Sequence, residues 1–198
     1  MQEYCERHGY HYIFHKSLMN TERHPSWNKL VMLNECMETH PNYDYYVWID
    51  DDILITNYNI SLESFITRFG FDKDDKKTLM VSEDIHVLNL TYPFNCGLLI
   101  LKPTSKQLLN KIWIMGKVLN HEHTPSWEQE TMQFYWTHID KSEFMVIPHK
   151  IIQSIYKTSW LPETHVWSRG DFAAHLAGRS NEERMSILEN LIGKIIRD

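Results

Sequence analysis

The sequence is poor in glycine, in cysteine and in long apolar runs, and each shortage excludes a class of protein. Its 198 residues include 7 glycines and contain no GxGxxG, P-loop or GxSxG motif, so we expect neither a glycine-built phosphate cradle nor a hydrolase nucleophile. The 3 cysteines form no CxxC pair, which argues against a disulfide framework or zinc knuckle and suits a reducing compartment. No apolar run reaches about eighteen residues, so we expect no membrane span in this chain.

An excess of basic charge is missing as well. The net charge is −6 and lysine and arginine do not cluster, which argues against binding of nucleic acid. An anionic ligand would therefore need a metal ion or a local basic residue. The composition, with 42% apolar and 23% charged residues, is ordinary for a soluble protein, and the length predicts a single domain over residues 1–198.

What the sequence does contain is an apolar strand pattern that runs into three adjacent carboxylates, Asp50, Asp51 and Asp52. Side chains alternate along a strand, so Asp50 and Asp52 should point one way and Asp51 the other. Neighbouring carboxylates beside a buried strand repel one another and lose hydration, so we expect a hard divalent cation, Mn²⁺ or Mg²⁺, between them. The alternative is a solvated acidic turn that ends the strand.

Strand and helix patterns alternate along the chain. Helical spacing covers residues 27–39, 61–69, 104–120, 127–136 and the stretch after 180, whereas strand patterns cover 10–14, 45–49, 79–82, 97–101, 144–147 and 172–174. Capping boxes that begin at Thr104, Ser126 and Ser180 mark three helix starts. The pattern predicts an α/β protein with a mostly parallel sheet covered on both faces, in which ligands bind at the carboxyl ends of strands.

A second candidate region follows the last predicted strand. His175 could add a metal ligand, Gly178 permits close approach of the backbone, and Arg179 could bind a phosphate bidentately. The alternative is a structural histidine followed by a turn. The pair His121-x-His123 is a rival metal site, although it lies far from any acidic cluster in the sequence.

Five motifs occur in an order that resembles glycosyltransferase family 34, which includes fungal α-galactosyltransferases and plant xyloglucan xylosyltransferases. They are Trp27-x-Lys29, Trp48-Ile-Asp-Asp-Asp52, Phe94-Asn-Cys-Gly97, Trp127-Glu-Gln-Glu130 and His175-x-x-Gly178. Each motif is weak alone, but the ordered set, over about residues 1–180, is specific. The resemblance implies a GT-A fold, a three-layer α/β/α sandwich. It also implies metal-dependent, retaining transfer of a galactosyl-like hexose from a UDP- or GDP-sugar to a glycan or glycoprotein acceptor.

The resemblance also implies a role for each matched residue. The metal ligands for Mn²⁺ (or Mg²⁺) would be Asp50, Asp52 and His175. The residues that bind the nucleotide sugar would be Lys29, Asp51, Asn95, Cys96, Gly97, Gly178 and Arg179. Glu128 and Gln129 would lie beside the anomeric carbon as catalytic residues. Two alternatives stay open: Lys29 as a solvated helix lysine, and Gln129 as the third helical residue of the Ser126 capping box.

Two features usual in the family are missing from this sequence. The sequence begins in the helix after the family's first strand, whose following loop holds the base and ribose, so we expect either a chain that starts late within a longer gene product or an incomplete uridine site that weakens donor binding. The membrane anchor is lacking too, which predicts a soluble, cytoplasmic chain. The competing functions are a catalytically degenerate GT-A domain that binds glycans or acts as a scaffold, and, less favoured, a nucleotidyltransferase. Trp160 and Trp167, in a proline-containing loop, are candidates for the acceptor side.

Overall fold

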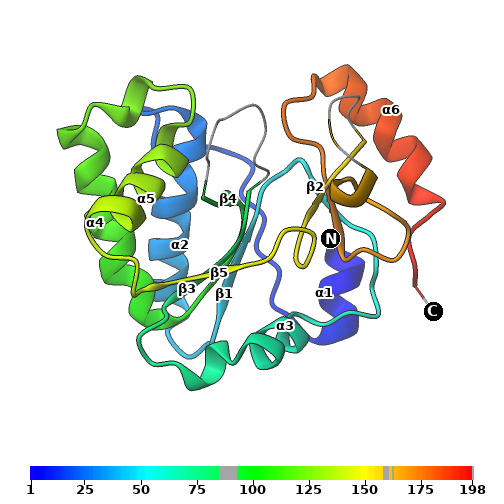
Figure 1. Cartoon of the computed structure of the whole chain (residues 1–198), viewed down its shortest axis with the longest axis horizontal. Coiled ribbons are helices and arrows are strands. Elements are labelled where there is room, and N and C mark those ends of the chain that lie inside the picture. Colours follow the sequence, from blue (N-terminus) through cyan, green and yellow to red (C-terminus); the bar gives the residue numbers. More distant parts are fainter. Residues whose placement is uncertain (85–92, 158–160, 162, 198) are drawn as a thin grey trace.

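The computed structural model describes residues 1–84, 93–157, 161 and 163–197. Its largest sheet has four strands in the order β1 (Tyr46–Ile49), β4 (Asn95–Leu101), β3 (Leu79–Ser82) and β5 (Phe144–Ile147) (Figure 1). β4 pairs antiparallel with β1 and with β3, whereas β3 and β5 are parallel. The α/β class is confirmed.

The expectation of a mostly parallel sheet holds for strand direction and is wrong for strand pairing. β1, β3 and β5 run in one direction, but β4 lies between β1 and β3 and runs the opposite way. A parallel connection normally needs a helical crossover, and among the described residues no helix lies between β3 and β4. Strand β4 therefore returns antiparallel, and its amino end meets the carboxyl end of β1.

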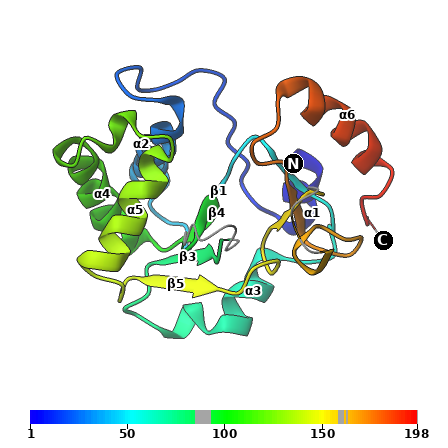
Figure 2. The ribbon, with the colours of Figure 1, turned by 45° about the horizontal axis from the view of Figure 1, so that its top comes forward.

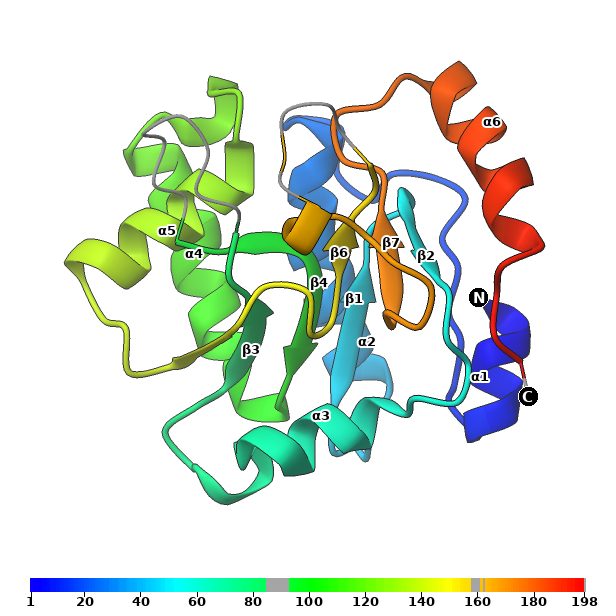
Figure 3. The same cartoon turned by 45° about the vertical axis from the view of Figure 1, so that its right-hand side comes forward.

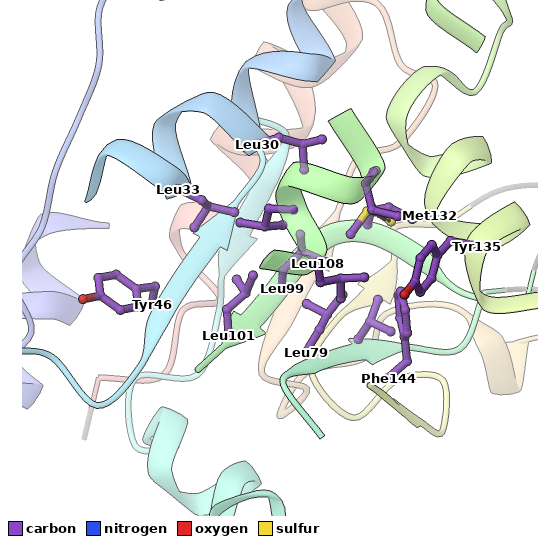
Figure 4. Packing of buried hydrophobic residues seen from close by; sticks show 14 of the residues in the cluster. Leu30, Leu33, Tyr46, Leu79, Leu99, Leu101, Leu108, Met132, Tyr135 and Phe144 are labelled. Atoms are coloured by element: carbon purple, nitrogen blue, oxygen red, sulfur yellow. Dashed lines mark hydrogen bonds between the residues drawn. The ribbon is translucent and has the colours of Figure 1, made fainter. Parts of the chain in front are cut away.

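The two faces of the sheet bury two different apolar clusters, because side chains alternate along each strand. Leu79 and Val81 belong to the cluster under the helices α2 (Asn28–Thr39), α4 (Lys106–Val118) and α5 (Trp127–His138), part of which Figure 4 shows. Met80 belongs to the cluster on the opposite face, which packs against α1 (Gln2–His8) and α3 (Leu62–Phe69). Figure 2 shows α2, α4 and α5 gathered on one side of the sheet.

A second, three-stranded sheet completes the layer on the α1 side. Its order is β2 (Ile53–Ile55), β7 (Ala173–His175) and β6 (Ser154–Ile155), with β2 antiparallel and β6 parallel to β7 (Figure 3). The helix α6 (Asn181–Ile192) follows β7. Strands of two or three residues are too short to show a periodicity, which is why β2 and β6 have no counterpart in the sequence prediction.

The ends of the helices show two glycine caps and test two of the predicted capping boxes. Gly9 and Gly70 end α1 and α3 with φ of 71° and 66°, a conformation that suits glycine. The Ser180 capping box at the start of α6 is confirmed. The Thr104 box is wrong, because a 3₁₀ turn over Pro103–Ser105 delays the start of α4. The other 3₁₀ turns cover Pro25–Trp27, Phe71–Lys73, His121–His123 and Glu163–His165.

The strand expected over residues 10–14 is also wrong. This segment pairs with no strand among the described residues, although its alternation of side chains is strand-like. Tyr10 is held instead by its hydroxyl, which donates to Glu63 and accepts from the backbone N–H of Leu62 at 3.0 Å. None of the helices in the described part of the chain is long and apolar enough to cross a membrane.

Candidate active site

The acidic triplet forms the turn that joins the two sheets. The backbone N–H of Asp50 donates to the carbonyl of Gly97 at 2.8 Å, which fixes the turn to the start of β4. The N–H of Leu176 donates to the carbonyl of Asp52 at 2.8 Å, which fixes the turn to the end of β7. In the same ladder His175 lies opposite Ile53. Strand pairing therefore places His175 beside the triplet from the far end of the chain.

The predicted strand alternation, with Asp50 and Asp52 on one side and Asp51 on the other, is wrong, because the triplet lies in a turn and its three side chains point in three directions. The side chain of Asp51 is 92% exposed, whereas that of Asp52 is 11% exposed. Asp50 points toward α2. Its carboxylate accepts from the indole N–H of Trp48 at 2.5 Å and lies 3.2 Å from the ammonium of Lys29. The role of Asp51 toward a donor stays a prediction.

Asp52 is bridged by two basic side chains. Its Oδ1 lies 3.3 Å from Nε2 of His175, and its Oδ2 accepts from Nη2 of Arg184 at 2.9 Å. Burial opposes ionisation of Asp52, but His175 and Arg184 together hold the pKa of this carboxyl below its ordinary value. Arg184 lies on α6 and was not predicted as a site residue, because only the docking of α6 brings it to the turn.

Asp52 and His175 fit two neighbouring ligands of one metal ion. Two donors at about 2.1 Å from a cation and at about right angles lie about 3 Å apart, close to the 3.3 Å between Oδ1 and Nε2. Asp50 is paired with Lys29, and no three His, Cys, Asp or Glu side chains converge on a metal position within the described residues, the rival pair His121 and His123 included. The three-residue ligand set thus remains a prediction.

Lys29 is the centre of a buried ion cluster between α2, β4 and α5. Its ammonium lies 2.8 Å from Glu128 and donates to the carbonyl of Cys96 at 3.0 Å, and its side chain is 3% exposed. The alternative of a solvated helix lysine is therefore wrong. Burial opposes the charge of Lys29, but Asp50 and Glu128 raise its pKa above the ordinary value. One oxygen of Glu128 is buried and has no hydrogen-bond partner within the described part of the chain.

The segment that begins β4 lies against the same cluster. Oδ1 of Asn95 accepts from the N–H of Gly97 and from the amide of Gln153, both at 2.9 Å. The thiol of Cys96 is buried toward Met132, and burial raises its pKa well above the ordinary value. Cys96 can therefore line a sugar pocket with its backbone alone.

Gln129 connects α5 to this segment. Its side-chain oxygen accepts from the N–H of Cys96 at 2.8 Å. The Ser126 capping box, which was the alternative account of Gln129, is wrong: Ser126 makes no side-chain cap, since its φ of −111° and ψ of 2° are not the extended conformation that capping needs. The catalytic roles of Glu128 and Gln129 stay predictions.

The turn after β7 holds the remaining predicted residues. Gly178 has a φ of 70°, a backbone conformation that glycine adopts readily and other residues rarely do. Arg179 donates to the carbonyl of Lys157 at 2.6 Å and lies 3.4 Å from Glu183, so its contact with a phosphate stays a prediction. Trp160 lies outside the described residues, and the indole of Trp167 donates to the hydroxyl of Thr56 at 3.0 Å.

Solved structures that share this fold are glycosyltransferases. The chain matches a glycosyltransferase involved in the glycosylation of the major capsid of PBCV-1 with a TM-score of 0.75 and 20% identity, over 96% of this chain and 88% of that one. It also matches the galactosyltransferase LgtC, solved in complex with donor and acceptor sugar analogs. The TM-score is 0.50 and the identity 13%, over 88% of this chain and 68% of that one. The fold is therefore that of the GT-A glycosyltransferases.

A model of the galactosyl transferase GMA12/MNN10 family matches residues 1–186, and the chain belongs to that family. Galactomannan galactosyltransferase 1 of Cyamopsis tetragonoloba is 27% identical over 60 residues, 30% of this chain and 14% of that protein. Xyloglucan 6-xylosyltransferase 4 of Arabidopsis thaliana is 31% identical over 55 residues, 28% of this chain and 11% of that protein. The resemblance to glycosyltransferase family 34 is confirmed, and the matched stretch is a small part of each relative.

Proposed function

We propose that the chain is a metal-dependent glycosyltransferase that moves a hexosyl residue from a nucleotide-diphosphate sugar to a glycan acceptor at the Asp50–Asp52 turn. The single observation that carries this proposal is the approach of Asp52 and His175 to 3.3 Å. A carboxylate oxygen and an imidazole nitrogen are ligands that Mn²⁺ accepts, and a metal of this kind commonly shares its shell with substrate phosphates.

The charges around the turn support a divalent cation. Lys29 faces two carboxylates, Asp50 and Glu128, and cannot neutralise both. Arg184 likewise faces Asp51 and Asp52. Among these six side chains the carboxylates outnumber the fixed cations by two, which one divalent ion would balance. Asp52 and His175 would hold that ion with Asp50 as the third ligand.

The chain's own residues have distinct tasks in this mechanism. When bound, the cation would neutralise the negative charge that develops on the departing diphosphate. Lys29 fixes the position of Asp50, 3.2 Å from its ammonium, and Gln129 fixes the start of β4 through its bond to Cys96, beside which the sugar would lie. Retention of anomeric configuration, which the resemblance implies, would follow from attack on the face that the diphosphate leaves. Because two relatives are named as a galactosyltransferase and a xylosyltransferase, nucleotide sugars that carry galactose or xylose are the first donors to compare.

The test compares Asp52→Asn and His175→Ala with the parent in a donor screen with Mn²⁺, in which release of the nucleoside diphosphate is measured. We expect both variants to lose metal-dependent release by at least about a hundredfold, in the range that loss of one electrostatic contact costs. Asp75→Asn, a change of an exposed aspartate in a remote turn, is the matched control. Undiminished turnover in both site variants, with the parent active, contradicts the proposal.

One observation favours the degenerate domain as a second candidate. Each oxygen of Asp52 has a basic side chain as its partner, His175 for Oδ1 and Arg184 for Oδ2, so protein groups alone can satisfy this carboxylate. A binding or scaffold domain would retain such a pair without turnover. Calorimetry with UDP and Mn²⁺ separates the two candidates, because absence of binding at millimolar ligand supports the degenerate domain.

A further inference from the structure

Arg184 occupies the position from which it can control access of a cation to Asp52. Its Nη2 donates to Oδ2 of Asp52 at 2.9 Å, and its Nη1 lies 3.7 Å from Asp51. A cation that binds Asp52 would come within a few ångströms of the guanidinium and be repelled by it. Metal entry therefore requires Arg184 to give up at least part of this contact.

The guanidinium of Arg184 has unused hydrogen-bond donors that could bind a second anion. Among the described residues only its bond to Asp52 is within hydrogen-bond distance, and its Nε is buried without a partner. The side chain is 26% exposed, so it can turn outward without opening the core. A guanidinium presents a planar fork of donors that binds phosphate oxygens bidentately. The diphosphate that bridges to a metal on Asp52 would be the nearest such anion.

We infer that Arg184 is an exchangeable counterion of Asp52, which moves from this carboxylate to the diphosphate of the donor when the metal binds. This inference rests on the proposed function, because it takes the same metal and the same class of ligand. Arg184 thereby couples the two binding events: it weakens binding of the metal alone, and it strengthens binding of the nucleoside diphosphate once the metal is present. It is a substrate-binding and positioning residue.

The experiment measures free Mn²⁺ by electron paramagnetic resonance, with and without UDP, in the parent, Arg184→Gln and Arg184→Lys. Lys194→Gln, which removes an exposed positive charge just beyond α6, is the matched control. We expect Arg184→Gln to bind Mn²⁺ alone about tenfold more tightly, within the usual range of coupling between two ligands. UDP should then raise its Mn²⁺ affinity less than it does in the parent, and Arg184→Lys should lie between the two.

The outcomes separate this inference from the proposed function. If the parent binds Mn²⁺ and UDP but Arg184→Gln and Arg184→Lys behave as Lys194→Gln does, the inference is overturned and the proposed function stands. If the parent binds neither ligand, both are overturned. Circular dichroism of each variant checks that a change in binding is not a loss of folded protein.

Discussion

Gly97 is packed so closely that even a methyl group has no room at its position. A Cβ there would lie 2.7 Å from Cε1 of His175 and 3.0 Å from Oδ1 of Asn95 and from Cδ1 of Ile53. Distances below about 3 Å force a neighbour to move, and two of these neighbours belong to the candidate site. The absence of a side chain at residue 97 thus sets the position of the His175 ring.

We therefore expect Gly97→Ala to displace His175 and to weaken Mn²⁺ binding at least tenfold, while stability falls by about 1–3 kcal/mol, the usual cost of overpacking. Calorimetry with Mn²⁺ and urea unfolding measure the two effects. Gly193→Ala is the control, because the added Cβ would have no non-adjacent described residue within 4 Å and the backbone there is ordinary. Unchanged Mn²⁺ affinity in Gly97→Ala would show that the position of the His175 ring does not depend on the absence of a side chain at residue 97.

At the residue scale, site residues that belong to a local sequence motif could be predicted, whereas those placed by tertiary packing could not. The triplet and His175 could be predicted because acidic residues after a strand and a histidine near a glycine form recognisable local patterns. Arg184 has no such pattern: it is one charged residue on an exposed helix, and its approach to Asp52 depends on how α6 docks. The buried state of Lys29 was equally invisible, since its partners come from three separate segments.

At the scale of elements, α2 and α4 pack closely because one of them carries a glycine. A Cβ at Gly116 of α4 would lie 2.0 Å from Cη2 of Trp27, which is fully buried at the start of α2. Trp27 meets the helix backbone directly, with its ring edge-to-face to that of Trp113 at 5.9 Å. The glycine thus costs some helix propensity but makes room for a fully buried tryptophan side chain.

We expect Gly116→Ala to destabilise the protein by about 1–2 kcal/mol. Alanine gains up to about 1 kcal/mol of helix propensity, but displacement of a fully buried indole costs more than this gain. Urea unfolding followed by circular dichroism measures the change, with Gly193→Ala again as the control. Mn²⁺ affinity should stay within about twofold of the parent, because this contact is remote from Asp52 and separate sites act independently. A stabilised Gly116→Ala would contradict this account of the packing.

Helices were easier to predict from the sequence than strands. Helices of about twelve residues, such as α2 and α6, show several turns of apolar spacing, and the Ser180 capping box marks a start by a local hydrogen bond. The strands β2 and β6 are too short for a period, and the direction of β4 depends on a connection, not on its composition. The alternating segment at residues 10–14 lacks a partner strand, so its pattern misled the prediction.

At the scale of the whole molecule, the two apolar clusters share one set of strands. Leu99 and Leu101 belong to the cluster under α2, α4 and α5, whereas Leu98 and Ile100 belong to the cluster on the opposite face. Because both clusters depend on side chains of the same strand, unfolding of β4 would disrupt both clusters together. The carboxyl-terminal segment also connects the two ends of the chain, since it lies beside α1 (Figure 3) and the side chain of Arg197 is 3.0 Å from that of Glu3. Residues 1–198 are therefore expected to unfold as one cooperative unit.

Two cysteines provide matched reporters for this expectation. Cys5 is buried in the cluster with α1, and Cys96 is buried in the cluster with α5. Burial raises the pKa of both thiols, so few thiolates form in the folded state and alkylation is slow. Pulsed alkylation at increasing urea, read by mass spectrometry, should show both thiols becoming reactive at the same midpoint. That midpoint should coincide with the loss of helical circular dichroism. Separate midpoints for Cys5 and Cys96 would mean that the two faces of the sheet unfold independently, and the single-domain prediction would then be wrong.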